Sequence, residues 1–290
     1  MTGLAAPRPA HLAGAVDSHA HVFGPAARYA FDPERPYTPP DAPVDAYLAM
    51  LDSLAMARGV LVQGTAHGLD NAALLAALQA SPERLRGIAT VPAQTSAEDL
   101  RTLRRRGVVG LRFHSDADPR HAGSVRLSAA AAHVHSLQRA GLQVQLLAKI
   151  DGIDEVALRH LVKGGVPVTI DHFGLVDVVA GTGHWAFRRL CDWVREGLVH
   201  VKLSAGYRLA SLPDLAALRP FHEALVEAGS NRLLWGTDWP HPRFDAGQPK
   251  ASDLLALFLA CTPEPMLQRR ILVENPTALF FASTPPATSP

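Results

Sequence analysis

The sequence contains few of the residues that mark secreted and membrane proteins. Its two cysteines among 290 residues, Cys191 and Cys261, form no CxxC motif and are too few for a disulfide framework. No apolar stretch reaches the roughly 18 residues that a membrane-spanning helix needs, and the N-terminus lacks the uninterrupted apolar core of a signal peptide. We therefore expect a cytoplasmic protein in a reducing compartment, without a membrane partner.

Charge is also scarce and nearly balanced. Charged residues make up 19% of the chain and the formal net charge is +1, so there is no strong electrostatic attraction to nucleic acid. The basic run Arg101, Arg104, Arg105 and Arg106 has no interleaved aromatic residues, which predicts a solvated helix face and not a nucleic-acid site. We expect a small anionic molecule as partner, and the sequence indicates no oligomeric state.

Short apolar runs that favour β-strands are abundant and alternate with alanine- and leucine-rich helical segments. The predicted strands cover residues 16–22, 59–64, 87–92, 108–114, 143–149, 167–174, 199–206 and 232–239. Predicted helices between them include 71–79, 97–106, 128–140 and 212–228. This alternation predicts a single-domain α/β protein, a (β/α)₈ TIM barrel. A doubly wound open sheet is the alternative, but no GxGxxG or GxxxxGK[ST] motif follows any strand.

The predicted barrel covers residues 14–282, between an N-terminal extension (1–13) and a tail, "STPPATSP" (283–290), that we expect to be disordered. The stretch from Phe23 to Pro43 is rich in proline and polar residues. A connection of that length inside a compact domain is more often functional than idle. We expect it to form a long loop after the first strand, over the barrel mouth.

Polar side chains at the ends of three predicted strands indicate an active site. His19 and His21 lie two residues apart in "DSHAHVF", so strand alternation places both on one face, with Asp17 below them. His172 ends the sixth strand, and Asp238 ends the eighth within "WGTDWPHP". Because the C-terminal strand ends meet at the barrel mouth, these four groups should converge there. They can hold a divalent metal and a water, or activate water without a metal.

Other polar residues near strand ends are weaker candidates. They are Gln63, Thr65 and His67 after the second strand, Arg112 and His114 in the fourth, Lys149 in the fifth, and Lys202, Ser204, Tyr207 and Arg208 in or after the seventh. A charged side chain inside an apolar barrel is costly unless paired. Arg112 and Lys202 are therefore expected to meet either an anionic substrate or an internal carboxylate. The histidines of predicted helices should lie at the surface: His133, His135, His160 and His222.

From Val16 to about Phe281 the chain resembles the amidohydrolase superfamily, in particular the amidohydrolase-related branch that contains 2-pyrone-4,6-dicarboxylate lactonase. The motifs that carry the resemblance are "DSHAHVFGP", "YTPPDAP", "VLVQGTAHGLDNAALL", "RGIATV", "GLRF", "IDHFG", "WGTDWPHP" and "ENPTALF". The resemblance implies that Asp238 is the general base and that the three histidines surround the reacting carbonyl and water: His19, His21 and His172. It also implies a substrate pocket to which five further residues contribute, namely Arg112, Arg208, Tyr37, Thr65 and His67. Lys149, at the end of the fifth predicted strand, is added to these substrate-binding candidates by its position.

The resemblance leaves the metal content open. Members of the superfamily commonly have a further metal-binding histidine at the end of strand five, whereas "VQLLAK" offers Gln145 and Lys149 there. The expectation is either no metal, which we prefer, or one divalent ion such as zinc. The ligands of such an ion would be His19, His21, His172 and Asp238.

These observations predict a hydrolase that opens a carboxylated lactone through water activated by Asp238. In "DHFGLVD", Leu175 stands near the place where the lactonase pattern has an arginine, which indicates a less anionic substrate than the pyrone dicarboxylate. Three alternatives remain at this point: a metal-dependent decarboxylase, a lactone isomerase, and a non-catalytic ligand-binding barrel.

Overall fold

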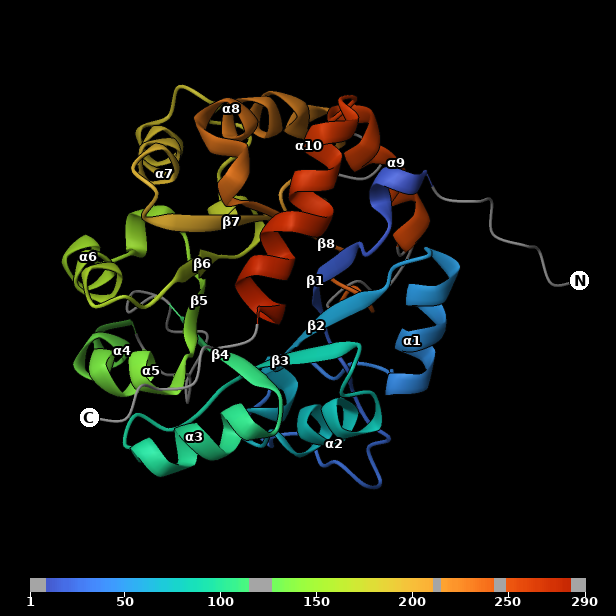
Figure 1. The fold of residues 1–290 in the computed structure, drawn as a ribbon, viewed down its shortest axis with the longest axis vertical. Helices are drawn as coiled ribbons and strands as arrows, with labels where there is room; N and C mark the ends of the chain where they lie inside the picture. Colours follow the sequence, from blue (N-terminus) through green and yellow to red (C-terminus); the bar gives the residue numbers. More distant parts are fainter. Residues whose placement is uncertain (1–8, 115–126, 211–214, 243–248, 283–290) are drawn as a thin grey trace, which may run out of the picture.

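The structure is a computed structural model that describes residues 9–114, 127–210, 215–242 and 249–282 (Figure 1). Eight parallel strands pair in chain order in one sheet, which confirms the (β/α)₈ barrel. The strands are β1 Val16–Ala20, β2 Arg58–Val62, β3 Leu85–Ala89, β4 Val108–His114, β5 Gln143–Leu147, β6 Val168–Ile170, β7 Val199–Ser204 and β8 Leu233–Gly236.

Helices surround the sheet, as the alternating pattern predicts. They are α1 Val44–Ser53, α2 Ala72–Ala80, α3 Ala97–Arg105, α4 Leu127–Ala132, α5 Val134–Ala140, α6 Glu155–Lys163, α7 Trp185–Arg195, α8 Arg219–Gly229, α9 Ala251–Cys261 and α10 Pro265–Arg269. Two π-helical turns follow α10, at Arg270–Glu274 and Thr277–Phe281. Short 3₁₀ turns are Ala10–Leu12, Thr65–His67, Ile150–Gly152, His172–Leu175, Gly206–Arg208, Leu215–Leu218 and Ser230–Arg232.

Most predicted elements differ from the structure by a few residues at their ends, and the helix predicted over 212–228 begins only at Arg219 of α8, after the 3₁₀ turn Leu215–Leu218. Two further differences have a clear backbone cause. The predicted helix 128–140 is divided at His133, whose φ of −108° interrupts the helical backbone between α4 and α5. Strand β6 ends at Ile170, earlier than the predicted residue 174, because His172 and Phe173 adopt left-handed φ angles of 52° and 54°. Both breaks are local backbone features that hydrophobic periodicity does not detect.

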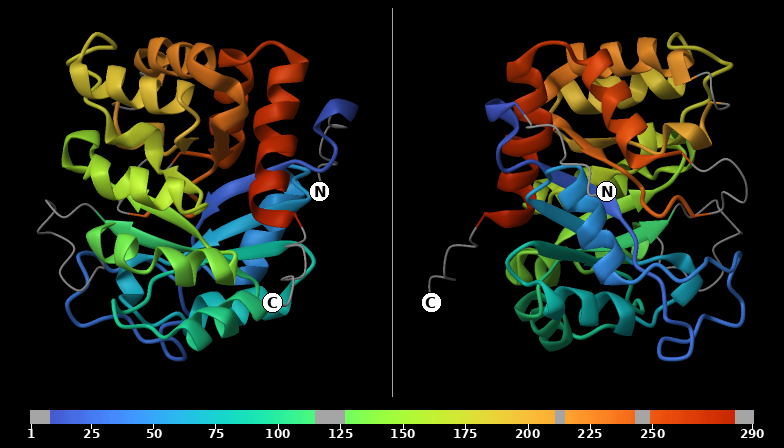
Figure 2. Two further views of the ribbon diagram at one scale, coloured as in Figure 1. Left: turned by 60° about the vertical axis from the view of Figure 1, so that its left-hand side comes forward. Right: turned by 90° about the vertical axis from the view of Figure 1, so that its right-hand side faces the viewer.

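The C-terminal segment closes one end of the barrel. Phe280 is buried inside it against Val16, Val60 and Leu234. The guanidinium groups of Arg58 and Arg86, near the starts of β2 and β3, lie 4.3 and 5.0 Å from the ring centre of Phe281. Figure 2 shows this segment, in red, and the loop after β1, in blue, at opposite ends of the barrel. The mouth at the C-terminal strand ends is therefore on the side of that loop.

The long loop after β1 is confirmed, and it packs against the mouth. Phe23 and Ala42 exchange two backbone hydrogen bonds, of 2.9 and 2.7 Å, that close the loop on itself. Phe23 and Ala42 form a small apolar cluster with Ala66, after β2, and Trp239, after β8. The loop is thus anchored to the ends of two strands.

Asp17 does not share the face of His19 and His21, so that part of the prediction is wrong. The pairing of β1 with β2 shifts between Asp17 and Ala20, a β-bulge that changes the side-chain alternation. Asp17 instead accepts hydrogen bonds from Tyr47 of α1 (3.1 Å) and from the backbone and side chain of Thr237 (2.9 and 2.7 Å). Burial raises the pKa of Asp17 to about 6, although the Thr237 hydrogen bonds lower it.

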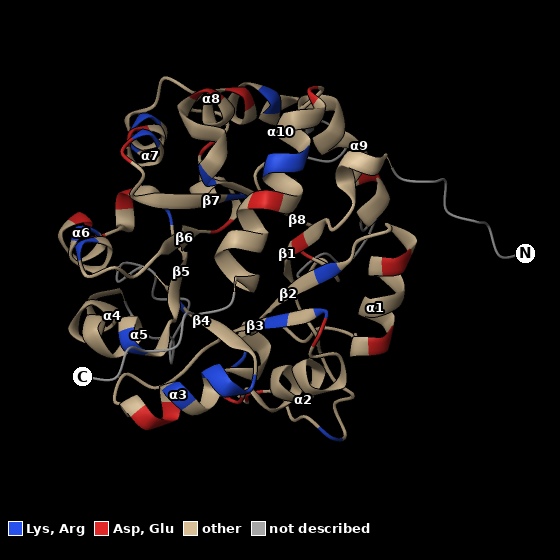
Figure 3. Ribbon diagram, viewed as in Figure 1, with Lys and Arg blue, Asp and Glu red and all other residues tan. Residues whose placement is uncertain are grey.

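The outer surface carries mixed charge. Figure 3 shows acidic and basic residues side by side on α3, α6 and α7. On α3, Glu98 pairs with Arg101 and Arg105, as expected for a solvated face. Within the described part of the chain, no helix has the length and apolar character needed to cross a membrane. The boundaries at residues 13 and 282 stay predictions, and the predicted tail lies outside the described residues.

His222 is buried, whereas the sequence pattern predicted a surface position. Its Nε2 lies 2.7 Å from the Thr262 hydroxyl, and its ring packs edge-on against Phe258 of α9. The prediction failed because α9 covers this face of α8, a contact that no local pattern in α8 indicates. His135 and His160 are exposed, as predicted, and His133 is half-buried.

We predict that burial of His222 makes the fold sensitive to acid. Burial lowers the pKa of His222 from 6.5 to about 4, so the unfolded state binds a proton that the folded state does not bind as the pH falls through this window. Its contribution to stability is therefore complete above pH 6.5 and is lost towards pH 4. His222→Gln removes this titration. Between pH 6.5 and pH 4 the free energy of unfolding of the variant should therefore fall by on the order of 3 kcal/mol less than that of the wild type.

Urea unfolding at a series of pH values measures this difference. His135→Gln, on the exposed face of α5, is the control and should follow the wild type. Parallel plots of unfolding free energy against pH for His222→Gln and the wild type would contradict the prediction.

Candidate active site

The structure brings together the four residues that the strand ends predicted. His19 and His21 lie at the end of β1, His172 follows β6, and Asp238 follows β8. All four side chains are buried, with His19, His172 and Asp238 at 0% exposure. The convergence across the barrel mouth is therefore confirmed, while the catalytic role of each group stays a prediction.

One carboxylate oxygen of Asp238 faces all three histidines. Its Oδ1 lies 3.2 Å from Nε2 of His21, 3.5 Å from Nε2 of His19 and 4.0 Å from Nε2 of His172. Its other oxygen, Oδ2, accepts a hydrogen bond from the Tyr207 hydroxyl. Burial would raise the pKa of Asp238, but the contacts with His172, His21 and His19 hold it well below its usual value. Asp238 is thus held in its ionised form.

Backbone geometry fixes these side chains. The residue that turns the chain away from β6, β7 and β8 has a left-handed φ in each case: His172 at 52°, Ala205 at 50° and Asp238 at 57°. This conformation costs a non-glycine residue on the order of 1 kcal/mol or more and is concentrated at functional sites. At Gly236, a Cβ atom would lie 2.6 Å from the backbone nitrogen of His19, so only glycine lets β8 approach β1 this closely.

The hydrogen-bond partner of Nδ1 places a hydrogen on that nitrogen of His21. Its Nδ1 lies 2.8 Å from the carbonyl oxygen of Val62, which only accepts, so Nδ1 carries a hydrogen. Its Nε2 faces the Asp238 carboxylate at 3.2 Å. Two acceptors at that distance repel each other, so Nε2 needs either a second hydrogen or a cation between it and Asp238.

Two groups of side chains have the arrangement of metal ligands. In the first, His19, His21 and Asp238 offer atoms that all lie within 4.8 Å of one another. The fit to a divalent ion such as zinc is good, because the carbonyl partner on Nδ1 of His21 is the usual support for a metal-bound Nε2. Nε2 of His19 is also buried without a hydrogen bond among the described residues.

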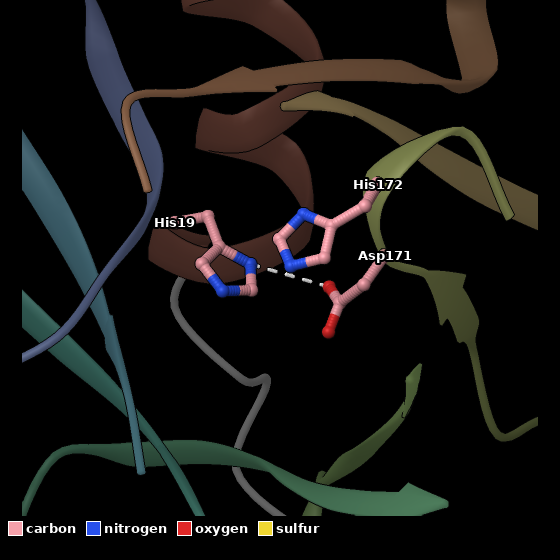
Figure 4. A group of neighbouring side chains, drawn as sticks. All are labelled: His19, Asp171 and His172. Atoms are coloured by element: carbon pink, nitrogen blue, oxygen red, sulfur yellow. Dashed lines mark ion pairs between the residues drawn. The ribbon is translucent and has the colours of Figure 1, made fainter. Parts of the chain in front are cut away.

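The second group, His19, Asp171 and His172, is less suited to a cation (Figure 4). Asp171 already accepts a hydrogen bond from Arg112 (3.3 Å) and lies 3.5 Å from the Lys202 ammonium. Two positive charges beside this carboxylate would repel a further cation. The buried residues can therefore hold one divalent ion, and the first group is the better site.

Arg112 and Lys202 pair with an internal carboxylate, one of the two expectations for them, and the role of Arg112 in substrate binding stays a prediction. Asp171 accepts hydrogen bonds from Arg112 and from the Gln145 amide (3.0 Å), whose oxygen in turn accepts one from Lys202 (2.7 Å). Burial would raise the pKa of Asp171, but contacts with His19, Lys202 and Arg112 hold it well below its usual value. Burial lowers the pKa of Lys202 to about 8, and Asp171 opposes this shift.

The remaining histidines of the site are neutral. Burial, with a smaller contribution from the charge of Lys202, lowers the pKa of His19 well below 6.5. Burial likewise lowers the pKa of His172 to about 4, against the attraction of Asp238. Nδ1 of His172 is 2.9 Å from the Ser204 hydroxyl, and its Nε2 is buried without a hydrogen bond within the described chain. The Nε2 atoms of His19 and His172 are therefore free to meet a substrate.

The predicted substrate-binding residues lie in different environments. Tyr37 is hydrogen-bonded to Thr65. His67 stacks on Phe23 and contacts the tilted ring of Phe31, and its Nδ1 lies 3.1 Å from the carbonyl oxygen of Ala30. Their roles in binding substrate stay predictions.

The two other basic candidates are both exposed. Arg208 is close enough to the site for its charge to lower the pKa of His172 and Tyr37. Lys149 lies just after β5, and among the described residues no contact joins it to the four central groups. Arg208 is therefore better placed than Lys149 to meet a ligand at the mouth.

Sequence reasoning gave no specific role to Tyr207 and did not select His241. Tyr207 donates to Asp238, and His241 is buried with its ring edge-on to Tyr207 at 5.5 Å. Their positions after β7 and within "WGTDWPHP" were the available signal, since residues just beyond barrel strands line the mouth.

Comparison with known proteins identifies the family of this chain. The profile of the amidohydrolase family matches residues 16–282. A 4-sulfomuconolactone hydrolase from Rhizobium radiobacter is 37% identical over 272 residues, which cover 92% of this chain and 90% of that protein. A 2-pyrone-4,6-dicarboxylate hydrolase from Comamonas testosteroni is 35% identical, with 93% of this chain and 90% of that protein covered.

Among solved structures, a probable 2-pyrone-4,6-dicarboxylic acid hydrolase from Acinetobacter baumannii, with citric acid bound, is similar in fold. Its TM-score is 0.79 at 28% identity, and the match covers 93% of this chain and 100% of that one. The chain therefore belongs to the amidohydrolase family, as an enzyme related over about nine-tenths of its length to lactone hydrolases.

Proposed function

We propose that this enzyme hydrolyses a lactone that carries at least one anionic group, with Asp238 as the general base. The observation that carries the proposal is the single Asp238 oxygen within 4.0 Å of three imidazole nitrogens at the barrel mouth. Two relatives support the substrate class, because their names describe hydrolysis of a sulfonated muconolactone and of a pyrone dicarboxylate. The related structure from Acinetobacter baumannii has citric acid bound, so a related protein holds a small carboxylate.

In the proposed reaction, Asp238 takes a proton from water as the water oxygen bonds to the lactone carbonyl carbon. The ring C–O bond then breaks, and Asp238 returns the proton to the leaving oxygen. The product carboxylic acid ionises and releases one proton to solution. In this proposal His19 and His172, whose Nε2 atoms lie 3.5 and 4.0 Å from Oδ1 of Asp238, donate hydrogen bonds to the carbonyl oxygen as negative charge develops on it.

The site also fits a divalent ion, held by His19, His21 and Asp238. A bound ion would polarise the carbonyl and lower the pKa of water to about 7. The roles of Asp238 as base and of His172 as donor are the same in either case.

The charges of the site favour an anionic substrate that is not highly charged. Four buried groups, Arg112, Lys202, Asp171 and Asp238, balance in sign, so a substrate anion needs a further positive partner. Arg208 is exposed near His172 and can form paired hydrogen bonds with a carboxylate. In the turn after β6, Leu175 adds no charge, so we propose a substrate with fewer anionic groups than a pyrone dicarboxylate.

We predict that Asp238→Asn lowers kcat by about 10²-fold or more, because a positioned base contributes about 10²- to 10⁴-fold. The amide keeps the shape of the side chain, so the far-UV circular dichroism spectrum should not change. Initial rates of proton release, followed with a pH indicator, measure the effect. Asp253→Asn, an exposed carboxylate on α9, is the matched control, and a rate for Asp238→Asn equal to that control would refute the assignment.

Loss of the Arg208 guanidinium should affect substrate binding more than chemistry. We predict that Arg208→Gln raises KM by about 10-fold or more with a smaller change in kcat, because hydrogen bonds to charged groups contribute about 1.5 to 3 kcal/mol. Arg188→Gln is the control, since Arg188 is an exposed arginine on α7. An unchanged KM for a carboxylated lactone would remove Arg208 from the binding site.

Chelation distinguishes the metal-free reaction from its alternatives. The purified enzyme is tested against pyrones, muconolactones and sugar-acid lactones, before and after treatment with a chelator and measurement of residual metal. We expect proton release to survive chelation. Loss of activity that zinc restores would assign His19 and His21 as metal ligands. Carbon dioxide release would indicate a decarboxylase, and substrate rearrangement without proton release would indicate an isomerase.

A further inference from the structure

We propose that Lys202 is a positioning residue that holds His19 in the tautomer with its hydrogen on Nε2. In that state His19 donates a hydrogen bond towards the reacting carbonyl. Binding of a metal at Nε2 is disfavoured, because that nitrogen carries the hydrogen. The effect of this tautomer on catalysis rests on the proposed function. The tautomer itself is a property of the resting protein.

Lys202 is surrounded by acceptors. Its side chain is fully buried in β7, and its Nζ lies 2.7 Å from Oε1 of Gln145, 3.2 Å from Nδ1 of His19 and 3.5 Å from Oδ1 of Asp171. A lysine ammonium has three N–H groups and no lone pair. Two of these donors have hydrogen-bond geometry, towards Oε1 of Gln145 and Nδ1 of His19, while the Asp171 carboxylate lies at ion-pair distance.

The orientation of Gln145 supports this arrangement. Its amide nitrogen donates to Oδ2 of Asp171 at 3.0 Å, which turns its oxygen towards Lys202. The opposite orientation would place the amide NH₂ against an ammonium and the amide oxygen against a carboxylate. Arg112 also donates to Oδ2, so Oδ1 is the oxygen of Asp171 that remains beside His19.

Lys202 and Asp171 compete for the same nitrogen of His19. Oδ1 of Asp171 is also 3.2 Å from Nδ1, and Figure 4 shows this contact as a dashed line. The contact is poorly aligned for an N–H donor: Oδ1 is buried and accepts no hydrogen bond of ordinary geometry from the described residues. The contact from Lys202 has hydrogen-bond geometry. Nδ1 is therefore an acceptor, and the single hydrogen of the neutral ring is on Nε2.

The two tautomers give His19 two different chemistries. With the hydrogen on Nε2, this nitrogen lies 3.5 Å from Oδ1 of Asp238 and can donate a hydrogen bond to a substrate or water beside Asp238. A metal at Nε2 would require that hydrogen to move to Nδ1, where Asp171 could accept it and Lys202 would have to turn away. Lys202 thus favours the donor state, and Asp171 would support the ligand state as carboxylates do for metal-bound histidines.

Nitrogen NMR of the wild-type protein tests the tautomer directly. Long-range ¹H–¹⁵N correlation spectra separate protonated from unprotonated ring nitrogens, and His19→Gln identifies the His19 signals by their loss. We expect Nε2 to be protonated and Nδ1 to be unprotonated in metal-free protein. A hydrogen on Nδ1 would overturn the proposal. Because no turnover is measured, that result would leave the proposed hydrolysis standing.

Zinc binding by Lys202→Met gives a second readout. Removal of the ammonium should move the His19 hydrogen to Nδ1 and tighten zinc binding by about 10-fold, the scale on which outer partners of ligands change metal affinity. Lys163→Met, at an exposed lysine of α6, should bind zinc like the wild type in isothermal titration calorimetry. Equal or weaker zinc binding by a folded Lys202→Met would overturn the proposal, and if that variant does not fold, the wild-type spectrum decides.

Discussion

The closure of the barrel between β1 and β8 is the constraint on which the site depends. The backbone nitrogen of Asp238 donates to the carbonyl oxygen of His19 at 2.8 Å, and that of His21 donates to Trp239 at 2.7 Å. These bonds place the first and last strands side by side, so residues more than 200 positions apart in the chain share one mouth. Gly236 allows the approach, and Asp17 adds a second link from β1 to Thr237. The distance from Asp238 to the histidines follows from this closure.

Below the mouth, the second requirement is that buried charges be compensated. Asp171 pairs with Arg112 and Lys202, Asp238 supplies the second negative charge, and Gln145 completes the hydrogen bonds around Asp171. This network occupies the barrel interior between the apolar layer around Phe280 and the histidines. It contributes more than neutralisation, because its contacts with Nδ1 of His19 determine what Nε2 of that residue presents to a ligand. The chemistry of the mouth is thus linked to the polar layer beneath it.

Local sequence patterns were sufficient to predict the strands and most of the helices, because apolar runs and helical periodicity are properties of neighbouring residues. They also identified His19, His21, His172 and Asp238, since polar residues at the ends of apolar strands are conspicuous. They failed at Asp17, where a bulge inverted the alternation, and at His222, which α9 covers. They left open whether Lys202 meets a substrate or a carboxylate. Each of these depends on contacts between segments distant in the chain.

The sequence by itself determined the barrel class, the location of the mouth and the residue types at it. The period of side chains along a strand and the rule that C-terminal strand ends form barrel active sites require no knowledge of packing. Only the tertiary structure decided the pairing. It determines which nitrogen of each histidine faces Asp238, and that Asp171 accepts a hydrogen bond from Arg112. Hydrogen-bond direction depends on differences of a few tenths of an ångström in the distances between atoms on different strands. Closure of the barrel sets these distances, and the strand sequences do not encode them.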